Sequence, residues 1–191
     1  MMPQLNRRDV VGHLLADGGD LLVVGGLGAP SWDITSVGDR DLNFPLWGAM
    51  GGAAMLGLGL ALAQPDRRVV VVTGDGEALM GLTALSTIGS AGATNLALVV
   101  LDNEHYGETG MQTTNTASGT DIAAVATACG FTDSALVTEA ADLAWATDMV
   151  RTGRGPVCAV FKVSADVPPQ VVPPRDGPHL VERFRSALAG D

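Results

Sequence analysis

The sequence predicts one α/β domain, built as a doubly wound parallel sheet with helices on both faces. Its strand-like segments are apolar from end to end, as strands covered on both sides are, and they alternate with helical segments. A length of 191 residues suits one domain, which we place at residues 1–166, with a tail at 167–191. Five of the ten prolines lie between 167 and 178, so the tail is expected to be an extended arm followed by a helix at 179–189.

The first predicted elements are a short helix and a buried strand. Asn6 is a favourable helix cap, and residues 6–16 have an amphipathic helical pattern. The apolar run 21–24 predicts the first strand. Residues 25–49 are expected to be irregular, and the apolar, glycine-rich run 50–63 predicts a buried helix.

The middle of the chain supplies two more strands. The runs VVVVT at 69–73 and LALVVL at 96–101 are continuous aliphatic segments bounded by turn residues. A helix over 79–91 is expected to connect them. These two strands are therefore expected to be neighbours in the sheet.

The last part of the domain repeats the alternation. Thr120 and Asp121 can cap a helix that ends at Cys129 and is stopped by Gly130. After it we expect a weak strand, a helix and a strong strand, at 135–137, 139–151 and 157–163.

The charge balance excludes two classes of partner. Eleven basic and 21 acidic residues give a net charge of −10, whereas proteins that bind nucleic acids or anionic membranes are basic. Lys162 is the only lysine, so the sequence has no phosphate-binding loop that ends in Gly-Lys-Ser/Thr.

The sequence also favours a reduced, cytoplasmic protein. The N-terminus lacks the apolar stretch and cleavage site of a secretory signal. The glycine-rich run 48–63 is sixteen residues long, short of the ~20 apolar residues that span a bilayer. Cys129 and Cys158 lie in apolar segments and have no metal-type spacing.

The chemistry is expected in the loops that follow three strands. Ligands of open parallel sheets bind beyond the carboxyl ends of the strands. The loops after Val24, Thr73 and Leu101 read GGLGAPSWD, GDGEALMG and DNEHYGETGMQ. Each combines glycines with polar side chains, which is typical of a loop that a ligand approaches closely.

The second loop places the Asp75 carboxylate between Gly74 and Gly76, where a strand leads into a helix. The N–H groups at a helix start favour an anion, so a carboxylate there is explained by a divalent cation between it and a phosphate. Asn103 follows Asp75 by 28 residues, at the end of the expected neighbouring strand, and its amide oxygen can reach the same ion. Alone, Asp75 could equally be a turn residue and Asn103 a strand-end cap.

With these residues the sequence resembles the diphosphate-binding domain of thiamine diphosphate-dependent enzymes. The family signature is Gly-Asp-Gly followed by Asn at about the spacing found here, and the likeness extends over residues 21–163. Gly48-Ala49-Met50-Gly51 and Tyr106-Gly107 strengthen it. The stretch 39–80 is most similar to the small subunit of sulfopyruvate decarboxylase and to the matching part of phosphonopyruvate decarboxylase.

The resemblance implies thiamine diphosphate and Mg²⁺ as cofactors. It makes the side chains of Asp75 and Asn103 and the main-chain carbonyl of His105 the metal ligands. The other residues implied to face the cofactor are grouped by loop: Gly26, Leu27 and Gly28; Gly48, through its carbonyl, and Met50; Gly74, Gly76, Glu77 and Ala78; Tyr106, Gly107 and Glu108.

The resemblance implies a different role for each group of these residues. Met50 would be an apolar wedge that holds the two cofactor rings in a bent conformation, although on composition alone it is a core methionine. Gly76, Glu77 and Ala78 would approach the diphosphate through backbone N–H groups. His105, Tyr106 and Glu108 either contact cofactor or substrate or belong to an exposed loop.

Two departures from the family pattern affect the expected function. The glutamate that activates the cofactor belongs to a separate pyrimidine-binding domain that these 191 residues lack, so a partner subunit is implied. The related decarboxylases tend to carry Ser-Arg-Glu where this chain reads Ser31-Trp32-Asp33. Losing that cation implies a neutral or apolar substrate.

The sequence therefore predicts the diphosphate- and Mg²⁺-binding subunit of a heteromeric 2-oxo-acid decarboxylase that forms an aldehyde and CO₂. Carboligation of the acetolactate-synthase kind is the nearest alternative. A catalytically silent binding subunit is a further alternative, but it would be marked by the loss of Asp75 or Asn103, and both residues are present. A nicotinamide oxidoreductase is suggested by the glycines at 26 and 28, but the motif lacks its third glycine and its acidic residue.

Overall fold

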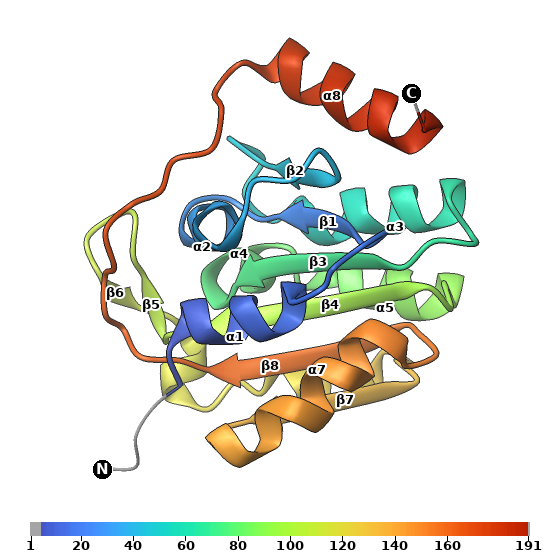
Figure 1. Cartoon of the computed structure of the whole chain (residues 1–191). Helices are drawn as coiled ribbons and strands as arrows, with labels where there is room; N and C mark the ends of the chain where they lie inside the picture. Colours follow the sequence, from blue (N-terminus) through green and yellow to red (C-terminus); the bar gives the residue numbers. More distant parts are fainter. Residues whose placement is uncertain (1–4, 191) are drawn as a thin grey trace.

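The computed structural model describes residues 5–190 and has three layers, with a parallel sheet between two layers of helices (Figure 1). The sheet has six strands in the order β2-β1-β3-β4-β8-β7. Every pairing in it is parallel, which confirms the predicted fold class. The strands are β1 (Leu22–Gly25), β2 (Asn43–Pro45), β3 (Val69–Gly74), β4 (Leu96–Asp102), β7 (Asp133–Val137) and β8 (Val157–Lys162).

Side chains from successive strand residues enter two separate apolar cores. On β3, Val70 and Val72 pack into the core on one face, whereas Val69 and Val71 pack into the core on the other. This alternation follows from the two-residue period of a strand. Both faces are covered, which explains why the strands are apolar throughout.

The helices divide between the two faces of the sheet. One core is covered by α1 (Arg7–Leu15), α2 (Ala29–Val37) and α7 (Leu143–Thr152), and the other by α3 (Ala53–Ala63), α5 (Thr83–Ala91), α6 (Ile122–Ala128) and α8 (Gly177–Ala189). Short elements complete the chain: α4 (Asp75–Met80), the hairpin of β5 (His105–Tyr106) and β6 (Gln112–Thr113), and two 3-10 turns, η1 (Asn115–Ser118) and η2 (Ala140–Asp142). No helix within residues 5–190 is long and apolar enough to cross a membrane.

Helix starts follow the capping signals in the sequence. The Asn6 side chain accepts hydrogen bonds from the backbone N–H groups of Arg8 and Asp9, and Asp121 caps α6 in the same way. Both predicted caps are confirmed. Each satisfies a backbone donor that the first helical turn leaves without a partner.

The stretch 25–49 is not irregular, as predicted, but contains α2 and the edge strand β2. The buried face of α2 includes Ser31 and Asp33, so the helix lacks a simple apolar stripe. Strand β2 has only three residues and pairs with β1 on one side alone. Neither element had a periodic signal long enough to predict it.

The helix expected over 79–91 is interrupted. Helix α4 begins earlier, at Asp75, and ends at Met80, and α5 begins at Thr83. At Gly81 a Cβ atom would lie 2.2 Å from the carbonyl oxygen of Gly51, so the chain there passes directly over the loop that precedes α3. Contact with this loop separates the two helices.

Helix α3 begins at Ala53 rather than Met50, and it is only partly buried. Ala49 and Gly51 have positive φ angles of 57° and 90°, which are incompatible with a helix. One face of α3 packs on the sheet, but Met55, Leu56 and Leu62 are exposed. The structure therefore contradicts the expectation of a buried helix and reveals an uncovered apolar face.

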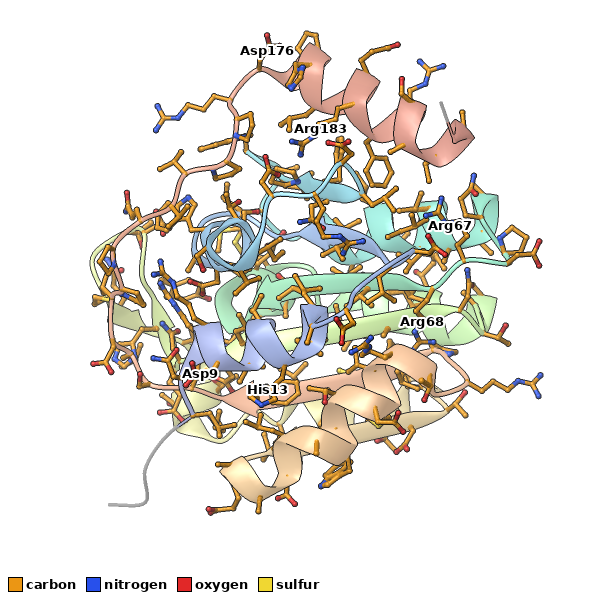
Figure 2. The ribbon with its side chains drawn as sticks, in the orientation of Figure 1. Asp9, His13, Arg67, Arg68, Asp176 and Arg183 are labelled. Atoms are coloured by element: carbon orange, nitrogen blue, oxygen red, sulfur yellow. The ribbon has the colours of Figure 1, made fainter. Side chains whose placement is uncertain are left out.

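The C-terminal arm runs along the carboxyl-end edge of the sheet before α8 returns beside β2 (Figure 1). Asp176 caps α8, and Arg183 lies on the same helix (Figure 2). The Arg183 Nη1 atom is 2.8 Å from the Asp39 carboxylate. The Trp47 indole N–H donates to the Pro174 carbonyl at 2.8 Å. These contacts attach the arm and α8 to the loops around β2.

A substitution test addresses the packing of α5 on α6. A Cβ atom at Gly89 would lie 1.8 Å from the Cys129 carbonyl oxygen, so Gly89→Ala must separate the two helices. We expect a loss of about 2 kcal/mol in the free energy of unfolding, as for other overpacked interiors.

Gly59 provides the control, because a Cβ atom there has no neighbour within 4 Å. Gly59→Ala should therefore stabilise helix α3 by about 0.5–1 kcal/mol. Urea titrations measure both, and equal effects would contradict the packing argument.

Candidate active site

The three predicted loops meet at one cavity of about 380 Å³. They follow β1, β3 and β4, which are adjacent strands whose carboxyl ends lie at the same edge of the sheet. The predicted site residues that line this cavity are Leu27, Met50, Gly74, Asp75, Gly76, Glu77, Asn103, His105, Tyr106, Gly107 and Glu108. The topology thus gathers residues that are as much as 81 positions apart in the sequence.

Asp75 is a buried carboxylate at the start of α4, with 1% of its surface exposed. Its Oδ2 atom accepts hydrogen bonds from the hydroxyls of Thr114, at 2.6 Å, and Thr116, at 3.4 Å. Burial raises the pKa of Asp75 and the charge of Asp102 adds to this, whereas the Thr114 hydrogen bond opposes it. Within the described part of the chain, no arginine, lysine or histidine forms an ion pair with this carboxylate.

Asn103 lines the same cavity as Asp75, and its backbone N–H lowers the pKa of the Asp75 carboxyl group. The Asn103 side-chain oxygen accepts from the backbone N–H of His105 at 3.0 Å. The His105 ring nitrogen Nδ1 lies 2.7 Å from the Asn103 carbonyl. Glu104, between them, has a positive φ of 63°, so the three residues form a tight turn.

The three residues predicted as metal ligands, Asp75, Asn103 and His105, therefore line the same cavity. They are a carboxylate, an amide oxygen and a backbone carbonyl, all hard oxygen donors. The set contains a single acidic side chain, which agrees with the finding that residues 5–190 hold no cluster of three or more His, Cys, Asp or Glu suited to a metal. A divalent cation would also neutralise the unpaired charge of Asp75.

Behind this turn lies an ion-pair network that sequence reasoning missed. Lys162, at the end of β8, reaches Asp102 at 3.0 Å and also contacts Glu104. The Thr116 hydroxyl donates to Asp102 at 2.8 Å. The only lysine of the chain thus holds the end of β4 in place, and this depends on the register that pairs Asp102 with Lys162.

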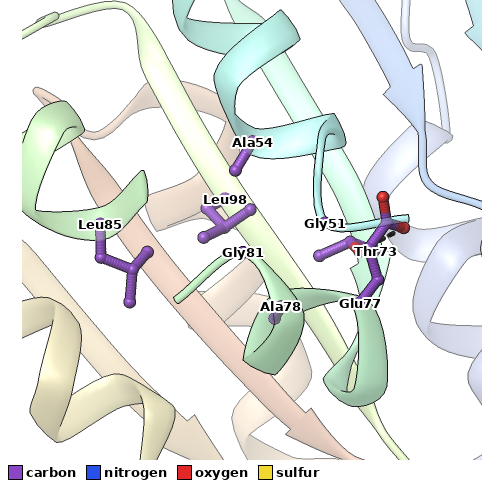
Figure 3. A pocket seen from close by; sticks show the side chains of 8 residues that line it. All are labelled: Gly51, Ala54, Thr73, Glu77, Ala78, Gly81, Leu85 and Leu98. Carbon is purple, nitrogen blue, oxygen red and sulfur yellow. Dashed lines mark hydrogen bonds between the residues drawn. The ribbon is translucent and has the colours of Figure 1, made fainter. Parts of the chain in front are cut away.

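The Glu77 side chain turns into the protein. Its Oε2 atom accepts from the Thr73 hydroxyl at 2.9 Å (Figure 3). The same atom accepts from the backbone N–H of Leu27 at 2.9 Å, and Oε1 accepts from the backbone N–H of Ala53 at 3.3 Å. A Cβ atom at Gly26 would lie 2.1 Å from Oε2, so only glycine fits there. One carboxylate therefore connects the loop after β1, the start of α3 and the end of β3.

Removing this carboxylate should weaken the fold. Glu77→Ala leaves two buried backbone donors without acceptors, for which we expect a loss of about 3 kcal/mol in unfolding free energy. Glu182, exposed on α8, provides the control, since Glu182→Ala should change stability by less than about 0.5 kcal/mol. Chemical denaturation checks both, and a stable Glu77→Ala protein would show that the connection is dispensable.

Met50 and Tyr106 approach the cavity from opposite loops and meet at Gly76. A Cβ atom at Gly76 would lie 2.6 Å from the Tyr106 ring and 3.6 Å from the Met50 methyl group. Glycine at this position lets both side chains pack on the backbone of the GDG loop. The Met50 side chain remains 39% exposed, held out from the sheet by the positive-φ residues on either side of it.

Comparison with known proteins agrees with this geometry. Residues 33–161 match the model of the "Thiamine pyrophosphate enzyme, C-terminal TPP binding domain" family. Sulfopyruvate decarboxylase subunit beta from Methanothermobacter thermautotrophicus is 40% identical over 90% of this chain and 89% of its own length. The chain belongs to the thiamine pyrophosphate enzyme family.

Two further proteins that are similar to this chain are longer than it. Phosphonopyruvate decarboxylase from Streptomyces viridochromogenes is 47% identical over 59% of this chain, which corresponds to 28% of that enzyme. The structure of benzoylformate decarboxylase from Polynucleobacter necessarius has a TM-score of 0.69 and 22% identity, and it shares the fold over 88% of this chain and 35% of its own. The chain thus spans about a third of the length of each of these two proteins.

Four residues that the family resemblance assigned to the cofactor do not line the cavity. Gly26 packs on Glu77 and Thr73, and Gly28, with φ of 77°, lies against the Glu108 side chain. Gly48 is exposed with open space beside it. Ala78 lines a smaller pocket beneath the GDG loop (Figure 3).

The structure adds cavity residues from both ends of the chain. Arg7 comes from the first helix, and Ala165, Val167 and Gln170 come from the arm. Trp32 also lines the cavity. The arm gave no sequence signal for this role, but Arg7 did, because it shares a helix face with three buried residues, Val10, Val11 and Leu14.

Proposed function

We propose that this chain is the diphosphate- and Mg²⁺-binding subunit of a heteromeric, thiamine diphosphate-dependent 2-oxo-acid decarboxylase. The observation that carries the proposal is the buried Asp75 carboxylate, unpaired among residues 5–190 and adjacent to Asn103 at the end of β3 and β4. An isolated buried carboxylate is costly unless a cation accompanies it. Relatives of this family that are 40% and 47% identical are named decarboxylases, which supports the reaction class.

The residues of the cavity fit the proposed cofactor. Asp75, Asn103 and the His105 carbonyl would hold Mg²⁺, and the backbone around Gly76 would approach the diphosphate. Met50 would set the conformation of the cofactor rings, and the loop from His105 to Glu108 would cover them. Thiamine diphosphate supplies, when bound, the electron sink that a 2-oxo acid needs to lose CO₂.

An exposed apolar surface supports the proposed partner. Met55, Leu56 and Leu62 on α3 are exposed, as are Met50 and Met80 at the loops beside it. Contiguous apolar patches on soluble proteins commonly mark interaction sites. A second subunit that packs on α3 would also close the cavity beside Met50, where the pyrimidine-binding domain is expected.

Isolation of the tagged chain from its own cells tests this proposal. We expect a second polypeptide and bound thiamine diphosphate, and an aldehyde and CO₂ as products from 2-oxo acids. A condensation product formed in the presence of an acceptor aldehyde would favour carboligation instead. A cofactor-free species that contains this chain alone would contradict the proposal.

Met50 provides a more local test. Met50→Ala should lower turnover of the complex by about 10-fold or more, because displacing reacting groups by ~1 Å can cost ~100-fold. Folding should be unaffected, since the side chain is partly exposed. Leu136→Ala, at an exposed position on the far edge strand β7, is the matched control. Wild-type turnover of Met50→Ala, measured at saturating cofactor, would rule out the wedge.

A further inference from the structure

Two buried carboxylates lie at the ends of adjacent strands. Asp75 directly follows β3, Asp102 is the last residue of β4, and both residues are buried. Asp75 lines the cavity, whereas Asp102 is not one of the residues that line it. Two buried like charges destabilise a fold unless polar groups or cations stabilise them. The groups between these carboxylates therefore decide how each of them is held.

The hydroxyls of Thr114 and Thr116 lie between the two carboxylates. Thr114 donates to Asp75 Oδ2 at 2.6 Å, and Thr116 donates to Asp102 Oδ1 at 2.8 Å. The two hydroxyl oxygens are 2.8 Å apart, and the Thr116 hydroxyl is also 3.4 Å from Asp75 Oδ2. Both threonines are buried, and neither lines the cavity. They therefore contact the carboxylates without taking the space of a ligand.

Lys162 lies at the other end of this chain of contacts. Its Nζ atom is 3.0 Å from Asp102 Oδ2, so both oxygens of Asp102 have partners. The sheet register places Lys162, on β8, beside Asp102. Asp102 is thus held on two sides and paired with a cation, whereas Asp75 has no cationic partner within residues 5–190. The contacts connect Asp75 to β4 and β8 and leave its charge for a cation to balance.

The Thr114 hydroxyl serves the carboxylate and not the turn to which Thr114 belongs. Thr114 is the N-cap residue of η1, a position where a threonine side chain commonly accepts from a backbone N–H of the first turn. It makes no such capping hydrogen bond. Backbone hydrogen bonds hold the turn instead, from the Thr114 N–H to the Glu104 carbonyl and from the Ala117 N–H to the Thr114 carbonyl. The side chain is therefore free to orient Asp75.

We propose that Thr114 and Thr116 are positioning residues of the metal site. The inference rests on the proposed function, because it takes Asp75 as a ligand of Mg²⁺. Mg²⁺ demands nearly ideal octahedral geometry, so a carboxylate that is oriented before the ion arrives loses less freedom on binding. Thr114 acts on Asp75 directly, and Thr116 supports it through Asp102 and Lys162.

Calorimetric titration of Mg²⁺ into the complex, in the presence of thiamine diphosphate, tests the assignment. Thr114→Val keeps the shape of the side chain but lacks the hydroxyl. We expect its Mg²⁺ dissociation constant to rise about 10-fold or more, because groups that orient metal ligands typically contribute about 10–100-fold in affinity. Thr114→Ser keeps the hydroxyl and should restore most of the affinity. A loss in Thr114→Ser as large as in Thr114→Val would show a packing role and overturn the proposal.

Thr147→Val is the matched control. Thr147 is also buried, and its hydroxyl donates to the carbonyls of Leu143 and Ala144 within α7, at a position that does not line the cavity. Urea titrations without Mg²⁺ establish that each variant is folded. Mg²⁺ binding should be unchanged in Thr147→Val, and an equal weakening in Thr147→Val and Thr114→Val would show a general structural effect and contradict the proposal.

Thr116→Val tests the connection to β8, and it carries the test if Thr114→Val does not fold. It should weaken Mg²⁺ binding less than Thr114→Val, because the Thr116 hydroxyl is the more distant from Asp75. Lys162→Met removes the cation on the other side of Asp102. The double variant should lose less affinity than the product of the two single effects, as residues of one network do. Independent effects would overturn the connection to β8.

The wild-type complex separates this inference from the proposed function. If it binds thiamine diphosphate equally well with Mg²⁺ and with a chelator, the proposed metal site itself is wrong. If its cofactor binding depends on Mg²⁺, and both valine variants bind Mg²⁺ as tightly as the wild type, only the positioning role is wrong.

Discussion

Asp75→Asn is expected to abolish Mg²⁺-dependent retention of thiamine diphosphate, weakening cofactor binding by more than about 100-fold. Substitutions in the outer shell of a metal site already cost about 10–100-fold in affinity, and Asp75 is the only acidic side chain in the proposed ligand set. Calorimetric titration of the cofactor, with and without a chelator, measures the loss. Asp66→Asn, in an exposed turn, provides the control with the same chemical change.

The same variant has a second expected effect, on stability without metal. Burial raises the pKa of Asp75 in the fold, so the ionised form destabilises the metal-free protein. This contribution grows as the pH rises from the unfolded value near 3.8 through the folded pKa. The metal-free Asp75→Asn protein should therefore be more stable than the wild type at neutral pH, and Mg²⁺ should stabilise only the wild type. Unchanged cofactor retention in Asp75→Asn would remove the metal assignment.

The purified chain alone is expected to turn over 2-oxo acids at least about 100-fold more slowly than the complex. The family resemblance places the activating glutamate on the partner, and loss of a positioned acid or base costs about 100–10,000-fold. Within the cavity, the Glu77 carboxylate is already occupied by three protein donors. Mixing the two purified subunits should restore turnover, whereas full activity of this chain alone would contradict the split between subunits.

An interface variant sharpens that test. Leu56→Asp places a charge on the exposed apolar face of α3 and should prevent assembly and activity while the chain remains folded. Val181→Asp makes a comparable change on the exposed side of α8. Complex formation is measured by light scattering, and an active Leu56→Asp complex would place the partner elsewhere.

The sheet could be predicted because its signal is local. The runs at 69–73 and 96–101 are apolar on both faces, and such strands have few alternatives in a domain of this length. The GDG loop and Asn103 were predicted together because parallel strand ends share one edge. The structure places Asp75 and Asn103 in the wall of one cavity, after the adjacent strands β3 and β4, as that argument required.

Features that depend on distant contacts could not be predicted. Helix α2 buries Asp33 against Arg7 and Arg8, which precede it by 26 and 25 residues. The residues near Asp33 in the sequence therefore do not show why its charge faces the interior. The break at Gly81 depends on Gly51, 30 residues away. Strands β5 and β6 have two residues each, which is too short to show the alternation of apolar and polar residues that predicts a strand.

The connection made by Glu77 has a consequence for exchanging parts between family members. Because the Glu77 carboxylate occupies the space that a side chain at position 26 would need, the residues at the two positions constrain each other. A chimeric chain with Gly26 but no glutamate at position 77 leaves a void and two backbone N–H groups, of Leu27 and Ala53, without acceptors. A chain with Glu77 and a larger residue at position 26 has a steric clash between the two side chains. A side chain at position 26 would in addition meet Thr73, whose Oγ1 and Cα atoms lie 2.8 and 3.1 Å from the position of its Cβ atom, so chimeric chains should keep the glycine together with the glutamate.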